Sequence, residues 1–141
     1  MHAAQRGTSL IELMLVMIVL GVLLVGGIPR AAKAAEEARV DAAAATLRSL
    51  WHAQRLYRFE TGVYAREESA LVDMRLVEPN VFTVTAPFVY RLEDADDVSF
   101  VWEAERTGTR VWTGTLSVDE NALLSGQLSD GDGDAIAPAG I

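Results

Sequence analysis

The sequence predicts an α+β protein in which one long N-terminal helix, its first half transmembrane, packs on a small antiparallel sheet of three or four strands. Residues 8–28 form an apolar run, and residues 31–60 are rich in good helix formers. Later residues alternate β-branched and aromatic runs with Asp, Asn and Gly, as strands and turns do. We expect six segments: a leader (1–7), a transmembrane and assembly helix (8–29), a projecting amphipathic helix (30–60), a connecting region (61–85), an antiparallel sheet (86–129) and an acidic flexible tail (130–141).

Composition and charge exclude several classes of function. The chain of 141 residues has a net charge of −8 and no cysteine, so disulfides and thiol nucleophiles are excluded. Residues 61–141 hold five basic and fifteen acidic residues, a net charge of −10. Because non-specific binding to nucleic acid depends on Lys and Arg neutralising phosphates, we predict no nucleic-acid partner.

The apolar run carries a single charge, Glu12, between Gly7 and Arg30. Its length is close to the ~20 residues that a membrane-spanning helix needs. A carboxylate at the centre of such a helix costs roughly 2.5–3.5 kcal/mol, which favours a functional role for Glu12. Arg6 in the short leader favours an N-terminus on the cytoplasmic side.

Two ordinary explanations of this segment compete with a more specific one. A secretory signal peptide would end near Ala32-Lys33-Ala34, although the adjacent basic residues fit such a cleavage site poorly. A plain membrane anchor would place Glu12 near the interface, where the N-terminal dipole of the helix eases its charge.

The more specific explanation is a resemblance. The segment Arg6-Gly7-Thr8-Ser9-Leu10-Ile11-Glu12-Leu13, followed by an apolar helix and Pro29, resembles the N-terminal signature of type IV pilins and type II secretion pseudopilins. The resemblance implies that a prepilin peptidase cleaves between Gly7 and Thr8 and methylates the new amine. Glu12 would then be the fifth mature residue, while Gly21 and Pro29 match positions at which the family often weakens its helix. Thr8 stands where the family usually has Phe or Met.

A physical argument gives Glu12 a partner. Cleavage after Gly7 would leave an amine on Thr8, which Glu12 of a neighbouring subunit could meet in a packed filament. Removing one member of such a buried pair costs roughly 3–5 kcal/mol, so the pair would favour one axial register. We also expect Gly21, the pair Gly26-Gly27 and Pro29 to kink or locally melt the helix.

The second helical stretch has one apolar face that we expect to pack on the sheet. Trp51, Tyr57 and Phe59 should supply bulk for this contact. In the connecting region, Leu71, Met74, Leu76 and Val77 are expected to turn inward. The face recurs at alternating spacings of three and four residues and consists of Val40, Ala43, Leu47, Leu50, Gln54 and Tyr57.

The strands are expected at residues 88–92, 98–104 and 110–118, with a short fourth strand at residues 123–128. Val98, Phe100 and Trp102 should share one face of their strand, because side chains alternate along a strand. Val111, Thr113 and Thr115 should likewise share a face of the next strand.

The sequence offers little for catalysis, and we predict that the chain is not an enzyme. His2 lies in the leader, and His52 is expected on the surface of the helix. Asp130, Asp132 and Asp134 alternate with glycines, as carboxylates in calcium loops do, but Ala135 and Ile141 occupy positions where such loops carry Gly and a bidentate Glu. A solvated tail is therefore favoured over a calcium site, which remains the alternative, and no other cofactor is expected.

Taken together, the residues and the resemblance predict a structural subunit of a type IV filament or a type II secretion pseudopilus. The resemblance implies a single-pass inner-membrane precursor with a cytoplasmic N-terminus and a periplasmic or extracellular C-terminal domain. Its partners would be the prepilin peptidase, other pilin or pseudopilin subunits, an inner-membrane assembly platform and membrane lipid. The alternative is a membrane-anchored extracytoplasmic binding module that forms no filament.

Overall fold

The computed structural model describes residues 10–139, except for the side chains of residues 24–29. It confirms an α+β architecture with a long N-terminal helix, α1 (Leu10–Thr61). Contacts divide the chain into two units, residues 1–36 and residues 37–141, and the backbone of α1 passes from the first unit into the second.

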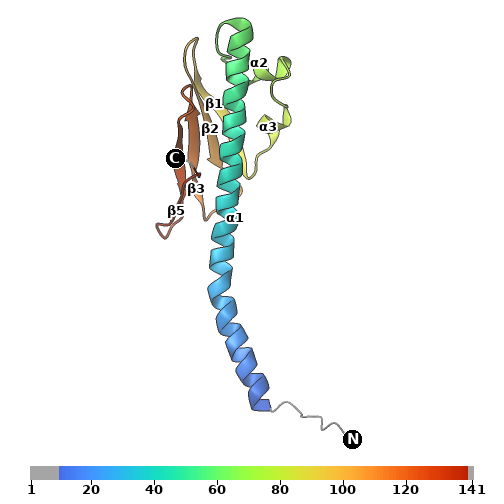
Figure 1. Ribbon diagram of the computed structural model, residues 1–141, viewed down its shortest axis with the longest axis vertical. Helices are drawn as coiled ribbons and strands as arrows, with labels where there is room; N and C mark the ends of the chain where they lie inside the picture. The colour runs from blue at the N-terminus through green and yellow to red at the C-terminus, as the bar shows by residue number, and fades with distance from the viewer. Residues whose placement is uncertain (1–9, 140–141) are drawn as a thin grey trace, which may run out of the picture. The chain divides into compact units, whose positions relative to one another are not determined.

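The second unit is a layer of helix on an antiparallel sheet (Figure 1). Two short helices, α2 (Glu68–Asp73) and α3 (Asn80–Thr83), connect α1 to the sheet, and α3 lies beside β1. The five strands follow chain order across the sheet, and every neighbouring pair is antiparallel. They are β1 (Phe88–Ala95), β2 (Phe100–Arg106), β3 (Thr113–Asp119), β4 (Leu124–Ser129) and β5 (Ala135–Ile136).

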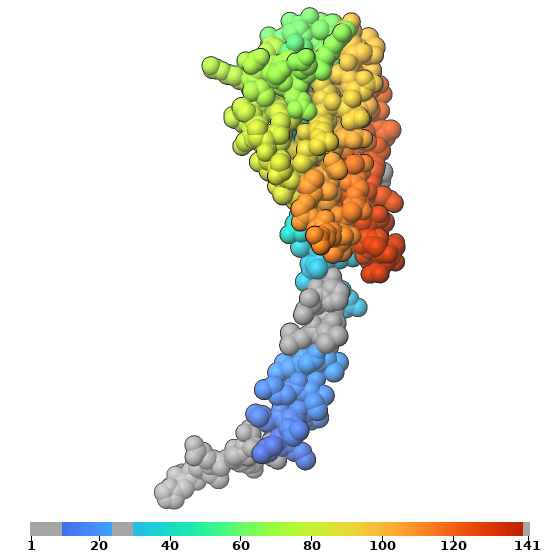
Figure 2. Space-filling view, turned by 180° about the vertical axis from the view of Figure 1, so that it is seen from behind, coloured from blue at the N-terminus to red at the C-terminus, as the bar shows by residue number. Residues whose placement is uncertain are grey.

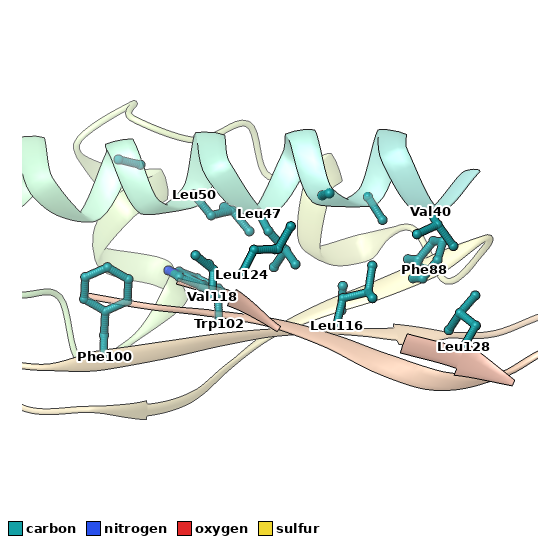
Figure 3. Close-up of a cluster of buried hydrophobic side chains, with 14 of the residues drawn as sticks. Val40, Leu47, Leu50, Phe88, Phe100, Trp102, Leu116, Val118, Leu124 and Leu128 are labelled. Atoms are coloured by element: carbon teal, nitrogen blue, oxygen red, sulfur yellow. The ribbon is translucent and has the colours of Figure 1, made fainter. Parts of the chain in front are cut away.

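The core lies between α1 and one face of the sheet, as Figure 3 shows. The predicted apolar face of the helix is confirmed from Val40 to Gln54, since all five of its residues in that range are buried. Tyr57, the last residue of that face, is partly buried against the core. The sheet contributes alternate residues, as a half-buried antiparallel sheet should. Its fully buried side chains include Phe100, Trp102, Ala104, Leu116, Val118 and Leu128.

The predicted number of strands, three or four, is wrong, because there are five. The fifth strand, Ala135–Ile136, pairs with β4 inside the segment expected to be a flexible tail. That segment is also tied to α1, since the Ala139 N–H donates to Asp41 Oδ1 at 2.9 Å and Arg48 Nη2 donates to the Ala139 carbonyl at 3.4 Å. A strand of two residues is too short to show an alternating pattern in the sequence. It is recognised only by its pairing with β4 in the folded chain.

Three predicted core contacts are also wrong. Phe59 is 87% exposed, because it follows Tyr57 by two residues and therefore lies on nearly the opposite face of the helix. Met74 is 37% exposed and follows the last residue of α2. Val98 is 65% exposed and does not share the face of Phe100 and Trp102, because it belongs to the turn before β2. In that turn the Val98 N–H donates to Asp96 Oδ1 at 2.7 Å.

Strands β3 and β4 approach each other closely at two glycines. A Cβ at Gly126 would lie 2.2 Å from the Thr115 carbonyl oxygen, and one at Gly114 would lie 2.3 Å from the Gln127 carbonyl oxygen. Both glycines have positive φ angles, of 94° and 142°. Side chains are therefore excluded at these two positions by both contact and conformation.

Candidate assembly surface

In the first unit, α1 exposes apolar side chains on every side. All residues from Leu10 to Leu23 are exposed, and their large apolar side chains range from 49% exposed at Val19 to 78% at Leu10 and Ile11. A helix on the surface of a globular protein carries a single apolar stripe, whereas one that is apolar all round belongs in a nonpolar environment. We call residues 10–23 the apolar segment. Its exposed surface is of the kind that is normally buried against lipid or other protein.

Glu12 is the single charged residue of the apolar segment. It lies in the first turn of α1, where the helix dipole favours a negative charge. Gly7 and Thr8, the predicted processing site, lie outside the described residues. The pairing of Glu12 with a Thr8 amine therefore stays a prediction.

The predicted weak points of the helix, Gly21 and Pro29, both lie within α1. The backbone is α-helical at every residue from 21 to 29, so the structure shows no local melting there, and the alternative expectation of a kink stays a prediction. Apart from the backbone of its own helix, a Cβ at Gly21 would meet no atom within 4 Å, so the structure of the single chain shows no contact that requires a glycine there.

We expected residues 8–29 to cross a membrane. Over the residues that the structure describes, no helix combines the length and the apolar character needed for a membrane span.

The three aspartates of the candidate calcium site form the turn between β4 and β5. Oδ1 of Asp130 accepts the N–H groups of Asp132 at 3.1 Å and of Asp134 at 2.8 Å. Asp130 N–H also donates to the Asp134 carbonyl at 3.0 Å. One carboxylate thus closes the turn, and within residues 10–139 no group of three or more acidic or histidine side chains is arranged to hold a metal ion.

A cluster that the sequence did not predict lies where α1 ends. Tyr64 is 1% exposed, and its hydroxyl oxygen accepts hydrogen bonds from Arg58 Nη1 at 3.0 Å and Arg55 Nη1 at 3.3 Å. The Arg58 guanidinium also lies over the Tyr64 ring, 4.7 Å from its centroid. The spacing of three residues between Arg55 and Arg58 could have indicated a shared helix face. Their convergence on Tyr64 depends on the turn that follows the helix.

A neighbouring ion pair belongs to the same end of the second unit. Arg66 Nη2 lies 2.7 Å from Asp97 Oδ1, and this contact raises the pKa of the Arg66 guanidinium above its ordinary value. Both side chains are largely exposed, so the pair contributes little to stability. The positive charge of Arg66 is therefore already paired with the carboxylate of Asp97.

No protein-family model matches this chain, and a search of curated proteins finds no relative.

Proposed function

We propose that this chain is a pilin-like structural subunit of a type IV filament or a type II secretion pseudopilus. The observation that carries the proposal is the apolar segment, which is exposed on all sides and carries Glu12 as its single charge. In the sequence, Glu12 lies five residues after Gly7, the offset of the prepilin signature. A short apolar helix with one carboxylate at this offset fits a subunit that leaves lipid to pack against other helices.

The proposed mechanism is mechanical rather than catalytic. A prepilin peptidase would remove residues 1–7, and residues 8–29 would hold the subunit in the inner membrane. An assembly platform in that membrane would then move the subunit into the filament. Because lipid tails and apolar side chains are similar environments, the apolar segment can exchange one for the other at little cost in hydrophobic burial.

Glu12 would determine the register of that packing. Its carboxylate would pair with the Thr8 amine of an adjacent subunit, and each charge would offset the desolvation of the other. A shifted subunit would leave both charges buried without partners, which costs several kcal/mol. The apolar segment and the unit that carries the sheet belong to one chain, so a register set by Glu12 would apply to the whole subunit.

Two experiments test the proposal. Mass spectrometry of the N-terminus should find a chain that begins at a methylated Thr8. A chain that begins at Ala35 would indicate secretion by signal peptidase, and an intact Met1 would favour the alternative function, a membrane-anchored binding module that forms no filament.

The second experiment replaces Glu12 by Gln, which removes the charge at nearly constant size. We expect membrane insertion to persist and the sheared filament fraction to lose the subunit. Glu60→Gln is the matched control, because Glu60 is exposed in the last turns of α1, and it should assemble normally. Equal incorporation of the Glu12 and Glu60 variants would refute the register mechanism.

A further inference from the structure

The Arg55–Arg58–Tyr64 cluster holds two positive charges that no carboxylate of the described residues neutralises. Tyr64 offers both guanidinium groups one neutral hydroxyl oxygen. Within the described residues, neither arginine forms an ion pair with a carboxylate. Arg66, the next cation along the chain, is paired with Asp97 and does not share this property. The cluster is therefore a preorganised site for an anionic group, in which Arg55 is exposed and Arg58 is partly exposed.

Asp132 is the complementary feature. It lies at the tip of the β4–β5 turn, between two glycines, and its side chain is exposed. The turn is held by the carboxylate of Asp130, to which Asp132 contributes its backbone N–H. The carboxylate of Asp132 itself accepts no hydrogen bond and forms no ion pair within residues 10–139. Its exposed carboxylate is therefore available for a contact with another molecule.

The two features lie at opposite ends of the second unit. Figure 2 shows the chain near residue 130 at one end of this unit and the chain near residue 60 at the other. The segment after the turn is bonded to Asp41 through Ala139, and α1 rises about 26 Å between Asp41 and Arg58. A pair between Asp132 and Arg55 cannot form within one chain, but it can form between two.

From this arrangement we infer that copies of this chain contact one another head to tail, with Asp132 of one copy bound by Arg55 and Arg58 of the next. The contact joins two different surfaces, so it leaves both outer ends open and repeats into a row instead of closing as a symmetric dimer. This inference rests on the proposed function, and it adds to the helix packing a contact between the sheet-bearing units. Because the charges are exposed, the contact orients subunits more than it holds them together.

Thiol crosslinking in the full-length chain tests this contact, since the chain has no cysteine of its own. The variant Arg55→Cys/Asp132→Cys would be treated in the producing cells with a short bifunctional maleimide. We expect a ladder of covalent dimers, trimers and longer products. The control variants are Arg55→Cys alone and Asp132→Cys alone, because a chain with one thiol can form a dimer but no longer product. Products no longer and no more abundant than those of the control variants would overturn the inference.

Charge reversal provides an independent measurement. Asp132→Arg should reduce the sheared filament fraction about fivefold, and Arg55→Glu in the same chain should restore most of it. If Asp132→Arg has no effect, or if Arg55→Glu fails to restore the loss, the inference fails.

The failure of this contact can be separated from the failure of the proposed function. Filaments that form normally but give no crosslinked ladder would refute the head-to-tail contact and leave the filament subunit intact. A ladder that persists in the Glu12→Gln variant at full strength would support the contact and count against assembly through the N-terminal helix.

Discussion

Gln54 and Ala65 exchange two hydrogen bonds across the turn that follows α1. Gln54 Nε2 donates to the Ala65 carbonyl at 3.0 Å, and the Ala65 N–H donates to Gln54 Oε1 at 2.9 Å. Gln54 is completely buried, and Ala65 is 1% exposed. The side-chain amide of Gln54 thus bonds both backbone groups of Ala65, as a neighbouring strand would do. These two bonds fix the backbone directly after Tyr64.

Replacing Gln54 by Leu should destabilise the second unit by about 2–4 kcal/mol, because the N–H and the carbonyl of Ala65 would both be left buried without partners. Chemical denaturation followed by tryptophan fluorescence would measure the change. Gln127→Leu is the control, because Gln127 is exposed on β4 and should change the free energy of unfolding little. A loss at Gln54 no larger than that at Gln127 would contradict the role of this exchange.

The glycines between β3 and β4 give a second prediction. Gly126→Ala should cost about 3 kcal/mol or more, since the new methyl group would meet the Thr115 carbonyl and the backbone has a positive φ. Gly131→Ala is the matched control, because a Cβ there meets nothing within 4 Å. Thermal unfolding of the two variants should separate them clearly, and similar melting temperatures would contradict the close approach of the strands.

The sequence predicts those parts of the fold in which the spacing of apolar residues along one segment determines the structure. The buried face from Val40 to Gln54 repeats at helical spacing and is confirmed. The α+β class follows from the change of period after Thr61. Local hydrophobicity places Val98 and Phe59 in the core, but their exposure depends on where a turn and a helix face lie in the folded chain. Apolar character alone does not decide burial.

The candidate sites divide in the same way. The position of Glu12 relative to Gly7 is visible in the sequence, because it is a spacing along one segment. The sequence does not show that Arg55 and Arg58 meet a buried Tyr64, because Tyr64 reaches them only through the turn fixed by Gln54. Nor does it show that, among residues 10–139, the Asp132 carboxylate has no partner while the Asp130 carboxylate closes the turn. Those facts depend on which side chains the folded backbone brings together.

The turn between β1 and β2 should give a pH-dependent contribution to stability. Oδ1 of Asp96 accepts the N–H groups of Val98 at 2.7 Å and Ser99 at 2.6 Å, and these bonds lower the pKa of Asp96 below its usual value of 3.8. The folded state then binds fewer protons than the unfolded state, so this contribution is present above the usual pKa and is lost as the pH falls through the folded-state pKa.

Asp96→Asn removes the charge and keeps an acceptor. We expect this variant to be less stable than the wild type at neutral pH, with a difference that shrinks as the solution is acidified below pH 3.8. Urea unfolding at several pH values would measure it. Gln127→Ala, which removes no titratable group, should follow the wild type throughout. If the difference in free energy of unfolding between Asp96→Asn and the wild type does not change with pH, the hydrogen bonds of the turn do not favour the charged carboxylate of Asp96.

The β4–β5 turn gives a prediction that separates turn closure from calcium binding. Asp130→Ala should destabilise the chain by about 1–2 kcal/mol, because two backbone N–H groups lose their acceptor, whereas Asp130→Asn should retain most of the stability through its amide oxygen.

A calcium site would behave differently, since calcium needs the negative charge and stabilises the folded state that binds it. We expect millimolar calcium to raise the melting temperature of the wild type no more than magnesium does. A calcium-specific rise that disappears in both Asp130→Asn and Asp132→Asn would instead establish a metal site, because turn closure alone does not require the carboxylate of Asp132.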